Sequence, residues 1–247
     1  TRRRRELYYQ VCPRAWGNGL DRKSGGSPVA VYRTVFLIGA ASLGGCVTAN
    51  VDEMTFDAPV AGMVDGSIVI LGRRHAPDYD TEPDFIDCIG NQIRRGDKGI
   101  TVIPEPQFVD SLYPWFEPRT APLSVENVGR LMILPSVANK LSELNLDYMI
   151  WIDGRTQDTN SSGSMTCGVG PTGAGCFGFG TWGTESEYEA TIWNFNDGAE
   201  VGKMSALTSG QSYMPAVVVP IPIIAPVQDT ACESLGTQLL QYLSAES

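Results

Sequence analysis

Histidine is almost absent from this chain of 247 residues, which contains only His75. A Ser-His-Asp triad, a Cys-His pair or a multi-histidine metal site would have to include that one residue. The sequence has no G-x-S-x-G or S-x-x-K motif to supply a matching serine. His75, Asp78 and Asp80 could ligate a cation, but we interpret "RRHAPDYD" as a solvated loop after a strand. We therefore predict no catalytic residue and no metal site.

Positive charge is scarce in most of the chain. Eight of the 18 Lys and Arg residues and two of the 28 Asp and Glu residues precede Cys46, which leaves 10 basic against 26 acidic residues from there onward. A body with this charge is repelled by a phosphate backbone. We predict that no nucleic acid is a partner.

Apolar runs long enough to cross a membrane are also lacking. "VFLIGAASLGG", residues 35–45, has eleven mostly apolar or small residues, whereas a bilayer span needs about twenty. Eleven residues preceded by a basic residue, Arg33, fit the apolar region of a signal peptide. We expect residues 1–45 to be a signal region, of which residues 1–30 are an upstream extension outside the mature protein.

The signal region ends in Leu43-Gly44-Gly45, and Cys46 follows it. This tetrapeptide resembles the lipobox of bacterial outer-membrane lipoprotein precursors: a leucine, two small residues and the cysteine that receives lipid. The resemblance implies cleavage before Cys46 and lipidation of its thiol. Because Val47 rather than Asp follows, it also implies the periplasmic face of the outer membrane. The membrane would then be a partner through the Cys46 lipid.

The remaining pattern predicts a tether over residues 46–66 and one α/β domain over residues 67–247. Apolar runs at 67–74, 99–105 and 146–155 predict strands. Helices are predicted between them, one capped by Thr81 and one that starts at Ser124 and is interrupted by Pro135.

The second half of the domain is predicted to be antiparallel. "NDG" at 196–198 indicates a hairpin turn, and a C-terminal helix starts at Thr230. We thus expect a mixed sheet with a parallel β-α-β-α-β first half, an added antiparallel hairpin and a C-terminal helix. This element order, with the lipobox, resembles the TolB amino-terminal domain and the curli-secretion lipoprotein.

Four cysteines follow Cys46, and an exported protein lies in an oxidising compartment. Of the three possible pairings we predict Cys167–Cys176, which closes a short loop, and Cys88–Cys232 on the apolar faces of two helices. The absence of C-x-x-C argues against zinc. The G-x-G-x-x-G pattern at 168–173 does not follow an apolar strand or open a helix, so we predict no dinucleotide cofactor.

Three aromatic residues in "SLYPWFEPRTAP", residues 111–122, lie among prolines that prevent a regular helix or inner strand. They could cover an edge of the core or form a rigid recognition loop. We predict the second and expect Asp153 and Arg155 to reach the same sheet edge. The predicted partner-binding residues are Tyr113, Trp115, Phe116, Arg119, Asp153 and Arg155.

Together these patterns favour a non-enzymatic, lipid-anchored cell-envelope protein that binds another envelope component, in a structural, accessory or assembly role. The alternative is a periplasmic hydrolase that cleaves cell-wall glycan through paired carboxylates. Glu105, Glu117 and Asp153, at or beyond strand ends, are the acids such a hydrolase would use.

Replacing Cys46 with serine tests the anchor. In a Gram-negative host the wild-type chain should lose residues 1–45 and gain the mass of its acyl chains. The Cys46→Ser chain should carry no acyl chains, and it should remain unprocessed or lose its acyl-dependent attachment to the membrane, because it has no thiol to acylate. If that variant matures to the same size and stays in the membrane, the lipobox interpretation is wrong.

Overall fold

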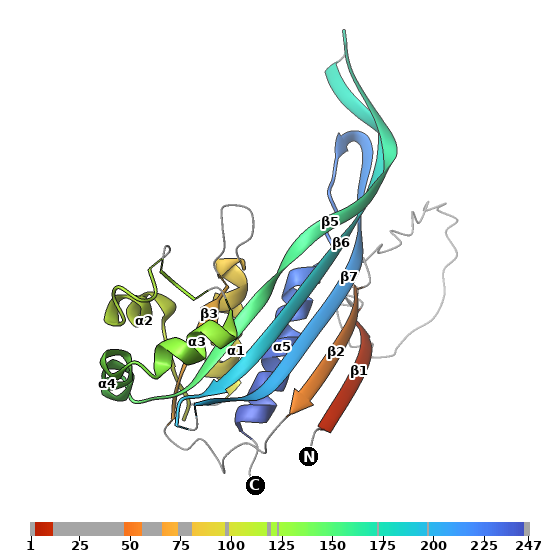
Figure 1. The fold of residues 1–247 in the computed structure, drawn as a ribbon. Helices are drawn as coiled ribbons and strands as arrows, with labels where there is room; N and C mark the ends of the chain where they lie inside the picture. The colour runs from red at the N-terminus through yellow and green to blue at the C-terminus, as the bar shows by residue number, and fades with distance from the viewer. Residues whose placement is uncertain are drawn as a thin grey trace, which may run out of the picture.

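One mixed sheet of seven strands organises the described part of the chain, with helices on both faces (Figure 1). The computed structural model describes residues 3–11, 47–55, 66–73, 81–96, 99–117, 120–122, 124–171, 173–196 and 198–244. The strands are β1 (Arg3–Val11), β2 (Val47–Thr55), β3 (Ser67–Gly72), β4 (Thr101–Ile103), β5 (Leu146–Gly170), β6 (Gly173–Asn194) and β7 (Ala199–Pro220). The helices are α1 (Pro83–Gly96), α2 (Glu105–Ser111), α3 (Val125–Met132), α4 (Pro135–Glu143) and α5 (Val227–Leu243).

The strands lie in the order β1-β2-β7-β6-β5-β3-β4. β3 pairs in parallel with both β4 and β5, whereas β5, β6 and β7 form an antiparallel meander, and β2 and β1 continue the sheet beyond β7. The predicted α/β class with a mixed sheet and a C-terminal helix is confirmed.

Alternation along the strands divides the apolar residues between two cores. On one face, Ile68 and Ile70 of β3 and Ile150 and Ile152 of β5 pack against α1 and α5. On the other face, the intervening residues pack against α2, α3 and α4. β3 is buried along its whole length, as expected of a strand covered on both faces.

Strands β5, β6 and β7 extend far beyond the helices (Figure 1). The sequence predicts a strand here only over residues 146–155, followed by a Gly/Ser-rich loop. That interpretation is wrong, because β5 and β6 stay paired from Tyr148–Asn194 out to Gly170–Gly173.

Several segments differ from what the sequence predicts. Residues 47–55, expected to be a tether, form β2 in register with β7, and residues 3–11 form β1 along β2. Thr81 is buried, and its hydroxyl donates to the Ile152 carbonyl oxygen at 3.3 Å instead of capping α1. Helix α2 lies where no helix was expected, with Pro106 in its first turn, where a missing N–H is harmless.

Both predicted disulfides are present. Cys88–Cys232 joins α1 to α5 across a sequence separation of 144, and Cys167–Cys176 joins directly paired residues of β5 and β6 at a separation of 9. The first bridge therefore links the first and last helices of the layer that covers one face of the sheet.

Removing the Cys88–Cys232 bridge should destabilise the body strongly. The double change Cys88→Ala and Cys232→Ala should lower the free energy of unfolding by about 4–5 kcal/mol, because the bridge closes a long loop of the unfolded chain. The matched pair Cys167→Ala and Cys176→Ala should cost about 2–3 kcal/mol at most. Denaturant titration measures both, and a larger loss from the second pair would contradict this ranking.

Candidate functional site

An ion pair lies at the carboxyl end of β3, beside the parallel strand β5. Arg73 follows β3, its N–H donates to the Ile152 carbonyl oxygen at 2.8 Å, and its guanidinium pairs with the Asp153 carboxylate. Both side chains keep about a third of their surface exposed, 31% and 29%. The second carboxylate oxygen of Asp153 is buried and accepts no hydrogen bond from the described residues. Asp153 is therefore neutralised by Arg73 and positioned to accept one further donor.

A partly buried polar cluster occupies the opposite face of β5. The Tyr188 hydroxyl donates to Glu82 Oε2 at 3.0 Å and contacts the Thr156 hydroxyl at 2.9 Å. The other Glu82 oxygen accepts the Thr156 N–H at 2.7 Å. The Tyr188 ring is fully buried and stacks on Phe85 of α1, with centroids 3.5 Å apart. The cluster therefore locks the start of α1 onto β5 and β6.

Burial raises the pKa of the Tyr188 phenol above its ordinary value, and the neighbouring Glu82 carboxylate raises it further. The phenol thus stays protonated and serves as a hydrogen-bond donor. Glu82 and Asp153 lie on opposite faces of the sheet, each with its own partner. These two acids cannot face each other across one cleft as paired hydrolytic carboxylates do.

The aromatic loop after α2 is divided between core and surface. Phe116 is 5% exposed and packs edge-on against Phe108, so its predicted role as a partner contact is wrong. Trp115 is half-buried against the same core, with the Lys140 ammonium 5.8 Å from its ring centroid. Tyr113 is 64% exposed. Only Tyr113, with one edge of Trp115, presents an aromatic surface here.

The other predicted site residues are placed as follows. Arg155 is exposed on β5, two residues beyond Asp153 and on the same face. Arg119, Cys46 and His75 lie outside the described residues. Among the described residues, no group of three His, Cys, Asp or Glu side chains could hold a metal ion. No described helix is long and apolar enough to cross a membrane.

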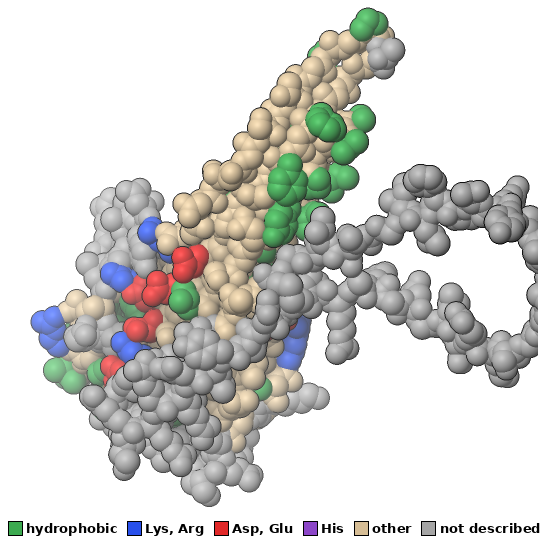
Figure 2. All heavy atoms as spheres, turned by 90° about the vertical axis from the view of Figure 1, so that its right-hand side faces the viewer, with side chains coloured by type: hydrophobic (Ala, Val, Ile, Leu, Met, Phe, Trp, Pro, Cys, Tyr) green, Lys and Arg blue, Asp and Glu red, His purple; other side chains and the backbone are tan. Residues whose placement is uncertain are grey.

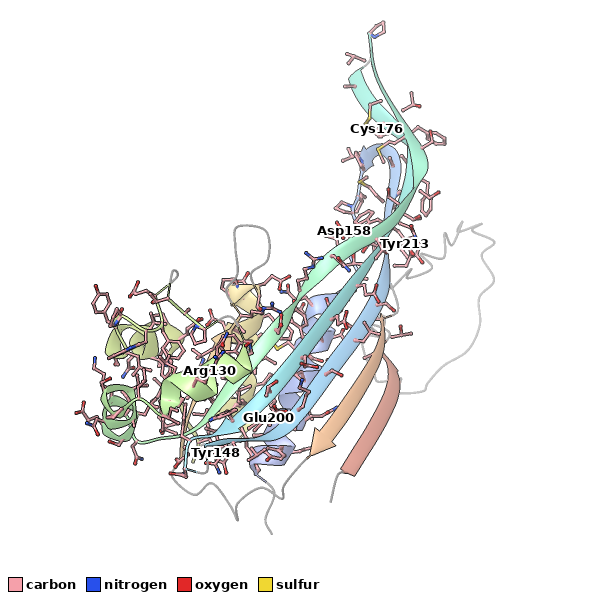
Figure 3. All side chains as sticks on the ribbon, viewed as in Figure 1. Arg130, Tyr148, Asp158, Cys176, Glu200 and Tyr213 are labelled. Atoms are coloured by element: carbon pink, nitrogen blue, oxygen red, sulfur yellow. A yellow bond between two sulfur atoms is a disulfide. The ribbon has the colours of Figure 1, made fainter. Side chains whose placement is uncertain are left out.

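The largest feature that the sequence analysis missed is a projection, which we call the arm and define as residues 159–171, 173–184 and 211–224. Figure 3 shows it leaving the body near Asp158 and Tyr213, with Cys176 farther out. Residues 159–184 and 204–228 contain no charged residue, although about 25–35% of an ordinary protein surface is charged. A surface hollow of about 580 Å³ lies at its base, lined mainly by hydroxyl-bearing residues and glycine.

Glycine explains both the shape of the arm and why the sequence analysis missed it. Gly163 and Gly178 have φ values of +131° and +154°. A Cβ at either position would lie 2.3 Å and 2.2 Å from a carbonyl oxygen of the paired strand. Glycine is therefore required for close pairing here. The usable signals were the uncharged stretches and the alternation of Phe177 and Phe179 with glycine.

The comparisons with known proteins do not assign this chain to a family. No family model matches the sequence, and no curated protein matches it. Two solved structures of PelC dodecamers from Paraburkholderia phytofirmans, one of them a point variant, are similar at 12% and 14% identity. Each match covers 81% of this chain and 99% of that chain, with a TM-score of 0.34. A likeness this low carries no argument about function.

The Tyr188 phenol should make stability fall at high pH. Its pKa in the folded protein lies above the unfolded value of about 10, so its contribution is complete below about pH 10 and is lost as the unfolded chain gives up the proton. Between about pH 9 and 11 the melting temperature of wild type should therefore fall more steeply than that of Tyr188→Phe.

The same substitution supplies the control. At neutral pH, Tyr188→Phe should cost about 1–3 kcal/mol, because the Glu82 and Thr156 side chains lose a buried partner. Parallel pH slopes for the two proteins, measured by thermal melting, would show that Tyr188 titrates alike in the folded and unfolded states.

Proposed function

We propose that this chain is a non-enzymatic, lipid-anchored protein of the outer membrane that binds another envelope component at the periplasmic face. The observation that carries the proposal is the lipobox ending at Cys46, together with the position of the residue that follows it. Val47 is fully buried and begins β2. The folded body thus begins one residue after the predicted acylation site, and a lipid on Cys46 would hold the sheet itself against the bilayer.

The sheet supports a binding role through its edge. β1 pairs with β2 along nine residues, from Arg3–Thr55 to Val11–Val47. Cleavage before Cys46 would remove β1 with the signal region and leave the outer edge of β2 without that neighbour. An edge strand of this length can accept a strand from a partner. Processing of the precursor would then make the binding edge available in the mature protein.

The polar groups favour binding over hydrolysis. Asp153 is tied to Arg73, and Glu82 accepts two hydrogen bonds from Thr156 and Tyr188 on the other face of the sheet. Tyr113 adds an exposed aromatic contact. If the chain hydrolysed glycan instead, Glu105→Gln, Glu117→Gln or Asp153→Asn would abolish cleavage of cell-wall fragments; we expect no cleavage from wild type or from any of these variants.

A pair of aromatic substitutions tests the contact surface. Tyr113→Ala should weaken binding of the envelope component that co-purifies with the lipidated chain and leave the melting temperature nearly unchanged, because the ring is exposed. Trp115→Ala should instead lower stability by about 1–3 kcal/mol, since a half-buried ring packs on the core. Loss of stability from Tyr113→Ala with unaltered co-purification would remove this loop from the binding surface.

A further inference from the structure

The two margins of the arm differ in chemistry. Large exposed apolar side chains gather along the β6–β7 side and the segment after β7, as the hydrophobic spheres along one margin in Figure 2 show. We call this set the apolar margin, and its members are Phe177, Phe179, Val217, Val218, Val219, Ile221 and Ile224. The β5 margin instead carries exposed hydroxyls and amides, among them Asn160, Ser162 and Thr166.

The backbone of the apolar margin is partly paired within the chain. The segment after β7 folds back, and Tyr213 and Ile223 exchange hydrogen bonds at 2.9 and 2.7 Å. Ile221 donates to the Pro215 carbonyl oxygen at 3.0 Å. Pro215, like residues 220 and 222, is a proline without an N–H. These bonds and the prolines reduce the number of unpaired N–H donors on this side, which lowers the cost of entering hydrocarbon.

The β5 margin does not meet that condition. β3 pairs with β5 only as far as Ile152, and no described strand pairs with that edge farther out. Its backbone groups need water or lipid headgroups, in agreement with its polar side chains. The arm is thus apolar and partly paired on one margin. Its other margin is mainly polar and open, apart from Val169 near the tip, like an element that lies in a membrane interface.

The base of the arm coincides with the predicted anchor. Asp158, Thr184, Gly210 and Val47 form one layer across β5, β6, β7 and β2. Val47 directly follows Cys46 in the chain. Asp158, in this layer, is the last charged residue of β5. Trp182 and Tyr213 lie two and three residues beyond the layer, where aromatic residues of a membrane interface are expected.

From these observations we propose that the apolar margin of the arm inserts into the hydrocarbon of a lipid bilayer. The proposal deepens the proposed function, on which it rests for the choice of membrane, but it needs no acyl chain for its test. From the base layer to Gly173 the arm is about 12 residues long, or roughly 40 Å at 3.4 Å per residue. That length exceeds the roughly 15 Å of hydrocarbon in one leaflet.

A matched pair of charges on one cross-strand row tests the insertion. Thr166, Phe177 and Val217 are direct neighbours across β5, β6 and β7. In the full chain carrying Cys46→Ser, Val217→Asp should weaken binding to phosphatidylcholine vesicles at least about tenfold, because a charge in hydrocarbon is costly. Thr166→Asp, with the same charge at the same level, should change binding less than about twofold. Both side chains are exposed, so thermal melts should be alike.

Quenching of tryptophan fluorescence by brominated lipid measures how deeply the arm enters the bilayer. In the Cys46→Ser chain that also carries Trp16→Phe, the arm should show quenching that is lost on adding Trp182→Phe. Trp182 lies on the arm, whereas Trp115, Trp151 and Trp193 belong to the body. Equal vesicle binding by the two aspartate variants, or no binding by the unacylated chain, would overturn the insertion. So would a lipid-free oligomer, seen by sedimentation, that only Val217→Asp dissociates, because the margin would then bind a second copy.

These outcomes are separable from the anchor itself. Suppose that the unacylated chain does not bind vesicles while the lipidated wild type fractionates with the outer membrane. The lipid anchor at Cys46 would then be supported and insertion of the arm would be contradicted. If the wild-type chain expressed in the Gram-negative host does not fractionate with membranes but the unacylated chain binds vesicles through Val217, the lipobox interpretation is contradicted. Insertion of the arm is then still supported.

Discussion

The continuous hydrogen-bonded ladder of β5, β6 and β7 is the constraint on which the rest of the structure depends. β5 pairs in parallel with β3 inside the body and antiparallel with β6 from Tyr148 to Gly170. The same backbone therefore sets the core and the arm. A slip by one residue would turn the buried side chains of the body outward, so the burial of Ile150 and Ile152 also fixes which residues of the arm face each way.

The polar cluster of Glu82, Thr156 and Tyr188 joins this ladder to helix α1 near the base of the arm. Glu82 at the start of α1 accepts from the Thr156 backbone and the Tyr188 phenol, and Phe85 stacks on the Tyr188 ring. A buried polar group needs its partners to be stable, so the entry angle of α1 is specified as well as its burial. The Cys88–Cys232 bridge fixes the other contact of α1, with α5.

The body was predictable from the sequence because its signals are periodic. The apolar run of β3, the helix break at Pro135 and the turn near Gly198 followed from residue type and spacing. Both disulfides followed from the closure of a short loop and the apolar faces of two predicted helices. The arm was not predictable in this way, since glycine and serine resemble a loop and its apolar residues have no core to face. The division of the aromatic loop also depended on tertiary contacts, because only the packing of Phe116 on Phe108 distinguishes it from the exposed Tyr113.

The way the arm protects its edges indicates the environment it suits. In water, edge strands are usually protected by lysine or other charges. Here the β7 edge is covered by prolines and by the returning segment at Ile223, without any charge. A two-stranded hairpin is marginal in water, and the Cys167–Cys176 bridge lies where Cys176 pairs with Val218, close to the end of β7. Each device stabilises the strands by covalent or backbone means, which still act in hydrocarbon, where a charged side chain would oppose insertion.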